Sequence, residues 1–114
     1  MKYSEKVKRS QAVVKAIKAL KDSEVLEFVY GKKRNYQTDE LHPAKFEIRA
    51  FELSSGGFMY SVSSVGRYGS MSVDKITPTT IKLYTFDMMG TRTSYNLPMY
   101  EMKIGLTITE DIED

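Results

Sequence analysis

The fold is decided by residues 24–30, which read EVLEFVY, because the hydrophobic pattern of the chain changes there. Before this stretch, over residues 4–20, apolar side chains recur at spacings of three, four and seven, which is the period of one face of an α-helix. From residue 24 onward apolar and polar residues alternate, and β-branched and aromatic residues become frequent, as in half-buried strands. The sequence therefore predicts one helix over 4–20 followed by a sheet.

The predicted helix is basic. Ser4 is its expected N-cap, since a serine side chain can accept a hydrogen bond from the free N–H groups of the first turn. Most lysines of the segment fall off the apolar stripe. We therefore expect the helix to lie on the sheet with its lysines toward solvent.

Alternation and turn residues divide the rest of the chain into short strands. A long polar loop is expected over 31–43. The next strand changes its apolar face between Ala50 and Phe51, which predicts a β-bulge or a strong bend. Further strands are expected near 58–62, 71–73 and 81–86, with a single-turn connector at 75–78. Residues 100–108 alternate without interruption and are predicted as the clearest half-buried strand.

These elements place the chain in the α+β class, mainly β, with an N-terminal helix packed on a small SH3/Sm-like antiparallel barrel and an extra C-terminal hairpin. A single domain is expected over 1–109. It comprises the helix, a barrel over 24–86 and the added hairpin over 92–108, which would cover an edge strand. Residues 110–114 form an acidic tail.

The composition excludes several classes of protein. The 114 residues include no cysteine, so disulfides and thiolate metal sites are excluded and a reducing compartment is expected. No apolar run approaches the roughly 20 residues that span a bilayer, and the start lacks the apolar region of a secretory signal. We expect a cytoplasmic protein with no membrane partner.

The net charge of +2 is unevenly distributed. Residues 1–34 hold ten basic and four acidic residues, whereas 35–114 hold seven basic and eleven acidic ones. Such asymmetry can mark a surface for phosphate or an acidic protein. Alternatively, the basic end neutralises the acidic tail, within one molecule or in a dimer.

No catalytic centre is visible. His42 is the only histidine, and its place beside Pro43 is typical of a turn residue. No spacing of acidic residues around it supplies a metal site, and no serine lies in a nucleophile-elbow pattern. We expect a non-enzymatic protein without metal or cofactor.

The region 12–76 resembles a WYL domain, the small Sm-like module found mostly in bacterial transcriptional regulators. The matching segments are AIKAL at 16–20, VLEFVY at 25–30, LHP at 41–43, GFMYSV at 57–62 and SVDKI at 72–76. The resemblance implies an Sm-like barrel and a regulatory ligand surface for nucleic acid or a nucleotide. As a free-standing barrel, the chain looks like the small SH3-barrel proteins of large tailed phages.

The family's ligand residues carry over only at Tyr60 and Lys75. Met59 and Ser61 stand for the tryptophan and leucine of the naming motif, and the arginine that usually precedes the last segment is missing. The resemblance therefore supports the fold better than the ligand.

Basic and aromatic residues in two polar turns give the first functional hypothesis. Barrels of this kind bind single strands by stacking bases on aromatic rings and meeting phosphates with Lys and Arg. Tyrosine also simply suits strands, which is the alternative explanation for most of the eight tyrosines. The candidate residues for binding nucleic acid or a nucleotide are Lys32, Lys33, Arg34, Tyr36, Tyr60, Arg67, Tyr68 and Lys75.

The second hypothesis is a protein-protein adaptor or inhibitor that docks on a host regulatory protein through the C-terminal hairpin. Met88 and Met89 lie in the turn beside this hairpin, and methionine is favoured on adaptable protein-binding surfaces. Ordinary core filling is the alternative explanation. Association into a homo-oligomer through sheet edges is a further expectation.

Overall fold

The computed structural model describes residues 1–35, 37–64 and 70–104. It contains one α-helix, one 3₁₀ turn and seven strands in these ranges. In chain order the elements are α1 (Tyr3–Lys18), β1 (Val25–Asn35), β2 (Glu40–Glu52), β3 (Phe58–Ser64), β4 (Met71–Ile76), β5 (Thr80–Phe86), β6 (Arg92–Pro98), η1 (Met99–Glu101) and β7 (Lys103–Ile104).

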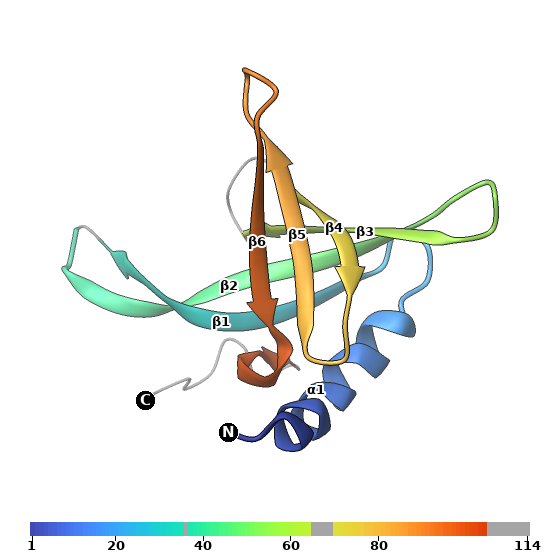
Figure 1. The fold of residues 1–114 in the computed structure, drawn as a ribbon. Coiled ribbons are helices and arrows are strands. Elements are labelled where there is room, and N and C mark those ends of the chain that lie inside the picture. Colours follow the sequence, from blue (N-terminus) through green and yellow to red (C-terminus); the bar gives the residue numbers. More distant parts are fainter. Residues whose placement is uncertain (36, 65–69, 105–114) are drawn as a thin grey trace.

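The strands form one antiparallel sheet in the order β6-β5-β4-β3-β2-β1-β7. Figure 1 shows that this sheet curls, so that β5 and β6 run across the direction of β1 and β2. The α+β, mainly β class is confirmed. The predicted barrel is a half-barrel, because β6 and β7 lie at opposite edges of the sheet and do not pair with each other.

The helix is confirmed and lies against one end of the half-barrel (Figure 1). It buries Val13 and Ile17, which belong to the predicted apolar stripe. The predicted cap is wrong: Lys2 occupies the N-cap position and makes no side-chain hydrogen bond, so Ser4 lies inside the first turn. No helix in the described ranges is long and apolar enough to cross a membrane.

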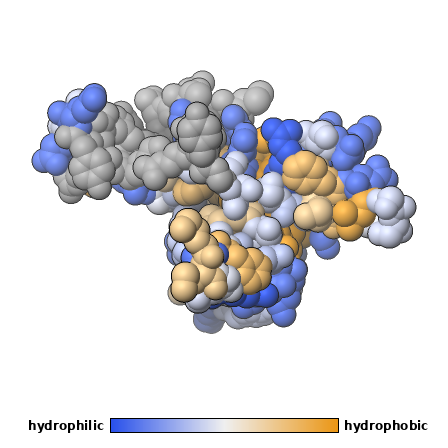
Figure 2. Space-filling model, turned by 90° about the horizontal axis from the view of Figure 1, so that it is seen from above, coloured by the Kyte–Doolittle hydropathy of each residue, from blue (hydrophilic) through white to orange (hydrophobic). Residues whose placement is uncertain are grey.

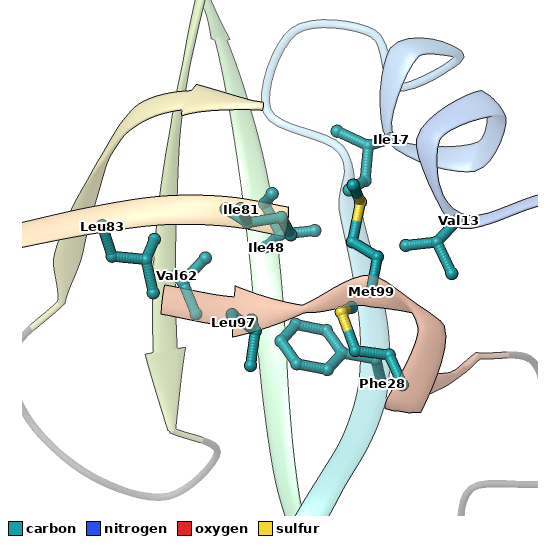
Figure 3. Close-up of a cluster of buried hydrophobic side chains, with 10 residues drawn as sticks. Val13, Ile17, Phe28, Ile48, Val62, Ile81, Leu83, Leu97 and Met99 are labelled. Atoms are coloured by element: carbon teal, nitrogen blue, oxygen red, sulfur yellow. The ribbon is translucent and has the colours of Figure 1, made fainter. Parts of the chain in front are cut away.

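The core lies where α1, the concave face of the sheet and η1 converge (Figure 3). Phe28 of β1 stacks on Phe46 of β2, with ring centroids 5.5 Å apart. The fully or nearly fully buried cluster consists of Val13, Ile17, Phe28, Ile48, Val62, Ile81, Leu83, Leu97, Met99 and Met102.

The predicted loop over 31–43 is wrong. Strands β1 and β2 continue as a paired ribbon, with Lys32 opposite Pro43 and Asn35 opposite Glu40. The register shifts between Val29 and Lys32, where Gly31 adopts φ +68°. Glycine takes this left-handed conformation without steric cost, so the irregularity is absorbed at one residue and pairing resumes beyond it.

The predicted bulge between Ala50 and Phe51 is also wrong. The pairing of β2 with β3 continues without a shift from Phe46 opposite Ser64 to Glu52 opposite Phe58. Shifts occur instead in β1 and in β4. The apolar residues change face because the end of the β2–β3 hairpin carries exposed apolar side chains on its outer face.

The added hairpin over 92–108 is not formed as predicted. Residues 92–98 pair with β5, whereas 99–101 form the 3₁₀ turn η1 and only Lys103 and Ile104 pair with β1. Met99 and Met102 are both buried at a spacing of three, which suits a helical turn better than a strand. Residues 105–114, which include the predicted acidic tail, lie outside the described residues.

Candidate functional site

The turn between β5 and β6 is held by one aspartate. The Oδ1 atom of Asp87 accepts hydrogen bonds from the backbone N–H of Met89 at 2.9 Å and of Thr91 at 2.8 Å. The N–H of Asp87 donates to the carbonyl of Thr91, and Gly90 adopts φ +81° within the turn. The turn therefore has a defined backbone conformation although it projects from the sheet.

The side chains at this turn form an apolar surface, which we call the tip surface and define as Phe86, Met88 and Met89. Met88 and Met89 are 102% and 88% exposed, and Phe86 is 62% exposed. Figure 2 shows apolar side chains gathered on the projecting hairpin. The tip surface contains both methionines that the sequence had singled out for docking, and neither fills the core.

The base of the same hairpin is fixed by aromatic and ionic contacts. The guanidinium of Arg92 lies over the ring of Tyr84 at 4.3 Å, and its Nη2 lies 3.5 Å from Oδ2 of Asp74. The ring of Phe86 meets that of Tyr84 edge to face, with centroids 5.7 Å apart. These contacts connect β4, β5 and β6 on the outer face and hold one side of the tip surface.

Apolar side chains are also exposed at the end of the β2–β3 hairpin, with Phe51 and Met59 on one face of the sheet and Phe58 on the other. Phe51 stands opposite Met59 across the strands, and Phe58 stacks on Tyr60 with centroids 6.4 Å apart. Phe51, Leu53, Phe58 and Met59 are all substantially exposed. The sequence analysis missed these exposed residues because it interpreted the change of apolar face as a bulge or a bend.

The basic residues of the first hypothesis lie on the β1–β2 ribbon. Lys32, Lys33 and Arg34 are consecutive residues of β1, and the ribbon projects from the sheet (Figure 1). The side chains of Lys33 and Arg34 are not among those described. Tyr36, Arg67 and Tyr68 lie outside the described residues, so their place relative to the ribbon stays a prediction.

Tyr60 and Lys75 do not share a surface. Tyr60 pairs with the buried Ala50 and packs against the core on the concave face. Lys75 is exposed and stands opposite Lys82 of β5. The residues on either side of Lys82 in β5 are buried on the concave face, so Lys82 and Lys75 lie on the outer face. The structure therefore separates the two residues that the family resemblance had carried over.

A shallow groove runs between α1 and the turn that connects β4 to β5. Its volume is about 350 Å³. Val7, Val14, Ile76 and Pro78 supply its apolar lining. Polar and basic side chains complete the lining, namely Gln11, Lys15, Lys18 and Thr77. The sequence analysis did not predict this groove.

Across the described ranges, no group of three or more histidine, aspartate and glutamate side chains is placed to hold a metal ion. Comparison with models of protein families, with curated proteins and with solved structures finds no match. The candidate sites therefore rest on the geometry of this chain.

Proposed function

We propose that this chain is a non-enzymatic regulatory adaptor that docks on another protein through the tip surface. The exposure of Met88 and Met89 carries this proposal. Water contact with apolar surface is unfavourable by about 25 cal/mol per Å², so burial of these side chains under a partner would favour binding. Methionine is flexible and polarizable, and can adapt to a partner's shape.

The conformation of the turn supports the same proposal. Asp87 fixes the backbone of the turn that carries both methionines. Binding of a partner therefore has to order only the methionine side chains, because the backbone of the turn is already ordered. Preorganisation of this kind reduces the entropic cost of association. The WYL-like, Sm-like identity of the half-barrel belongs to the proposal as well, and the order of one helix followed by five antiparallel strands supports it.

Met88→Asp combined with Met89→Asp should abolish capture of the partner, because two carboxylates would have to be desolvated at the interface. Capture is measured by pull-down with the purified full chain and mass spectrometry of the bound proteins. The thermal unfolding midpoint should stay within about 2 °C of the wild type, because surface changes away from structural contacts cost about 0.5 kcal/mol or less.

Met59→Asp is the control, since it also replaces an exposed methionine by a carboxylate, but on the β2–β3 hairpin. It should retain capture. If the partner still binds the tip variant, or is lost equally with Met59→Asp, the tip surface is not the docking site.

A second candidate function is binding of nucleic acid or a nucleotide along the β1–β2 ribbon. The observation in its favour is that Lys32, Lys33 and Arg34 lie consecutively on a projecting antiparallel ribbon. A two-stranded ribbon is narrow enough to approach a nucleic acid backbone or groove. Three consecutive basic residues concentrate positive charge in this part of β1.

The combined change Lys33→Glu and Arg34→Glu tests this candidate. Fluorescence anisotropy with a labelled single-stranded oligonucleotide should show affinity falling steeply between 50 and 200 mM salt for the wild type. The variant should bind at least tenfold more weakly and with a shallower salt slope. Lys15→Glu with Lys18→Glu makes the same charge change on α1 and should bind like the wild type. Binding that ignores both salt and the ribbon variant would exclude the ribbon.

A further inference from the structure

Strand β6 is an open edge of the sheet. In the described part of the chain, β5 is the only strand with which it pairs. All five residues from Arg92 to Asn96 are exposed, although successive side chains point to opposite faces. Neither face of β6 is therefore covered over these five residues, and its outer edge is accessible along them.

The hydrogen bonds at both ends of the hairpin fix the direction of its backbone groups. The N–H of Asp87 donates to the carbonyl of Thr91 at 3.0 Å, and the N–H of Met99 donates to the carbonyl of Thr79 at 2.9 Å. The register between these bonds is continuous. In an antiparallel ladder, residue pairs that exchange backbone hydrogen bonds alternate with pairs that do not. Counting along the register from either end of the hairpin assigns the same residue pairs to each kind.

This alternation divides the residues of β6 into two sets. Thr93 and Tyr95 direct their backbone N–H and C=O toward β5. Arg92, Ser94 and Asn96 form the non-hydrogen-bonded pairs with β5, so their backbone groups point to the open edge. Three successive donor and acceptor sites, centred on Ser94, are thus presented at a regular spacing.

The edge lacks the usual features that prevent pairing. Natural sheets protect edges with charged side chains, prolines or bulges. Residues 93–97 of β6 carry no charge, its only proline is the terminal Pro98, and its register with β5 has no shift. The one charged residue, Arg92, is held across its own sheet by Tyr84 and Asp74.

We propose that β6 pairs antiparallel with β6 of a second copy of this chain, about a two-fold axis at Ser94. The pattern of outward groups is symmetric about Ser94, so each copy offers what the other needs. Ser94 then stands opposite Ser94, and Arg92 opposite Asn96, with no like charges opposed. On the other face Tyr95 of each copy stands opposite Thr93, a favourable aromatic and β-branched pair.

This pairing is independent of the proposed adaptor function, because it uses the edge of β6 and not the tip surface. Isologous contacts about a two-fold axis are the commonest way in which identical chains associate. A continuous sheet through both copies would also remove the aggregation hazard of the open edge.

The test is the mass of the full chain by light scattering after size exclusion, over loading concentrations from about 10 μM to 1 mM. We expect a concentration-dependent dimer. Ser94→Pro removes the central outward N–H and not a bond to β5, so it should give a monomer with unchanged circular dichroism. Ser94→Ala keeps the backbone and should remain dimeric. A wild-type monomer at every concentration would overturn the proposal.

A charge exchange tests the register without a proline. Ser94→Lys and Ser94→Glu should each be monomeric, because each places like charges opposite one another, whereas an equal mixture should restore the dimer. If each variant alone stays dimeric, another surface holds the copies together and the proposal is wrong. Partner capture by the monomeric variants should be unchanged, so loss of the dimer and failure of the adaptor function are separate results.

Discussion

Replacing Phe28 with alanine should lower the free energy of unfolding by about 3–5 kcal/mol. Phe28 is fully buried, stacks on Phe46 and belongs to the cluster that joins α1, the sheet and η1. It also lies in the central part of β1, where it pairs with both β2 and β7. Removing the ring leaves a cavity where three elements meet. Because β1 is paired with a strand on each side, its backbone cannot easily move to fill that cavity.

The measurement is urea unfolding followed by circular dichroism. Phe86→Ala is the matched control, because the same ring is lost from a side chain that is 62% exposed and meets the ring of Tyr84 edge to face. We expect it to cost less than about 1 kcal/mol. Equal losses for the two variants would mean that the core is not centred on β1.

The helix and the first strand could be predicted because their signals are local. Val13 and Ile17 follow the helical period and are buried, and Phe28 lies in a stretch rich in β-forming residues. These segments also meet each other in the core, so local preference and tertiary packing favour the same structure.

The continuation of β1 and β2 beyond Gly31 could not be predicted in the same way. Polar residues such as Lys32 and Asn35 resemble a loop in sequence, because the ribbon they form projects away from the core. Its pairing is maintained by backbone hydrogen bonds across the ribbon, and those leave no trace in the hydrophobic pattern. The glycine signalled an irregularity but not that pairing resumes after it.

The candidate sites were predicted only in part. Met88 and Met89 were singled out because they lie in a turn and methionine is favoured on adaptable protein-binding surfaces, and their exposure agrees with the docking hypothesis. The apolar end of the β2–β3 hairpin was missed because Phe51 looked like a core residue out of phase. A hydrophobicity pattern cannot separate a side chain that is buried from one that is exposed for a partner. The open edge of β6 could not be predicted either, because it follows from the order of the strands. That order is set by pairing between residues that are distant in the sequence.

Met99→Ala should lower the free energy of unfolding by about 2–5 kcal/mol, the range for truncating a buried methionine. Met99 is fully buried, and its N–H bonds to the carbonyl of Thr79. It begins the turn η1, which packs on α1 and carries Tyr100 under the ammonium of Lys6 at 5.0 Å. Loss of this side chain would therefore loosen the helix as well as the end of β6.

Met89→Ala is the matched control, because the same atoms are removed from a side chain that is 88% exposed. It should change the free energy of unfolding by about 0.5 kcal/mol or less, measured by urea unfolding. The comparison also separates two structures for this segment. A strand alternating from Tyr100 would bury Tyr100 and Met102 and turn Met99 toward solvent, so Met99→Ala would then cost no more than Met89→Ala. If only Met99→Ala lowers the free energy of unfolding strongly, this segment must form the helical turn. Only a helical turn places Met99 and Met102, which are three residues apart, on the same buried side.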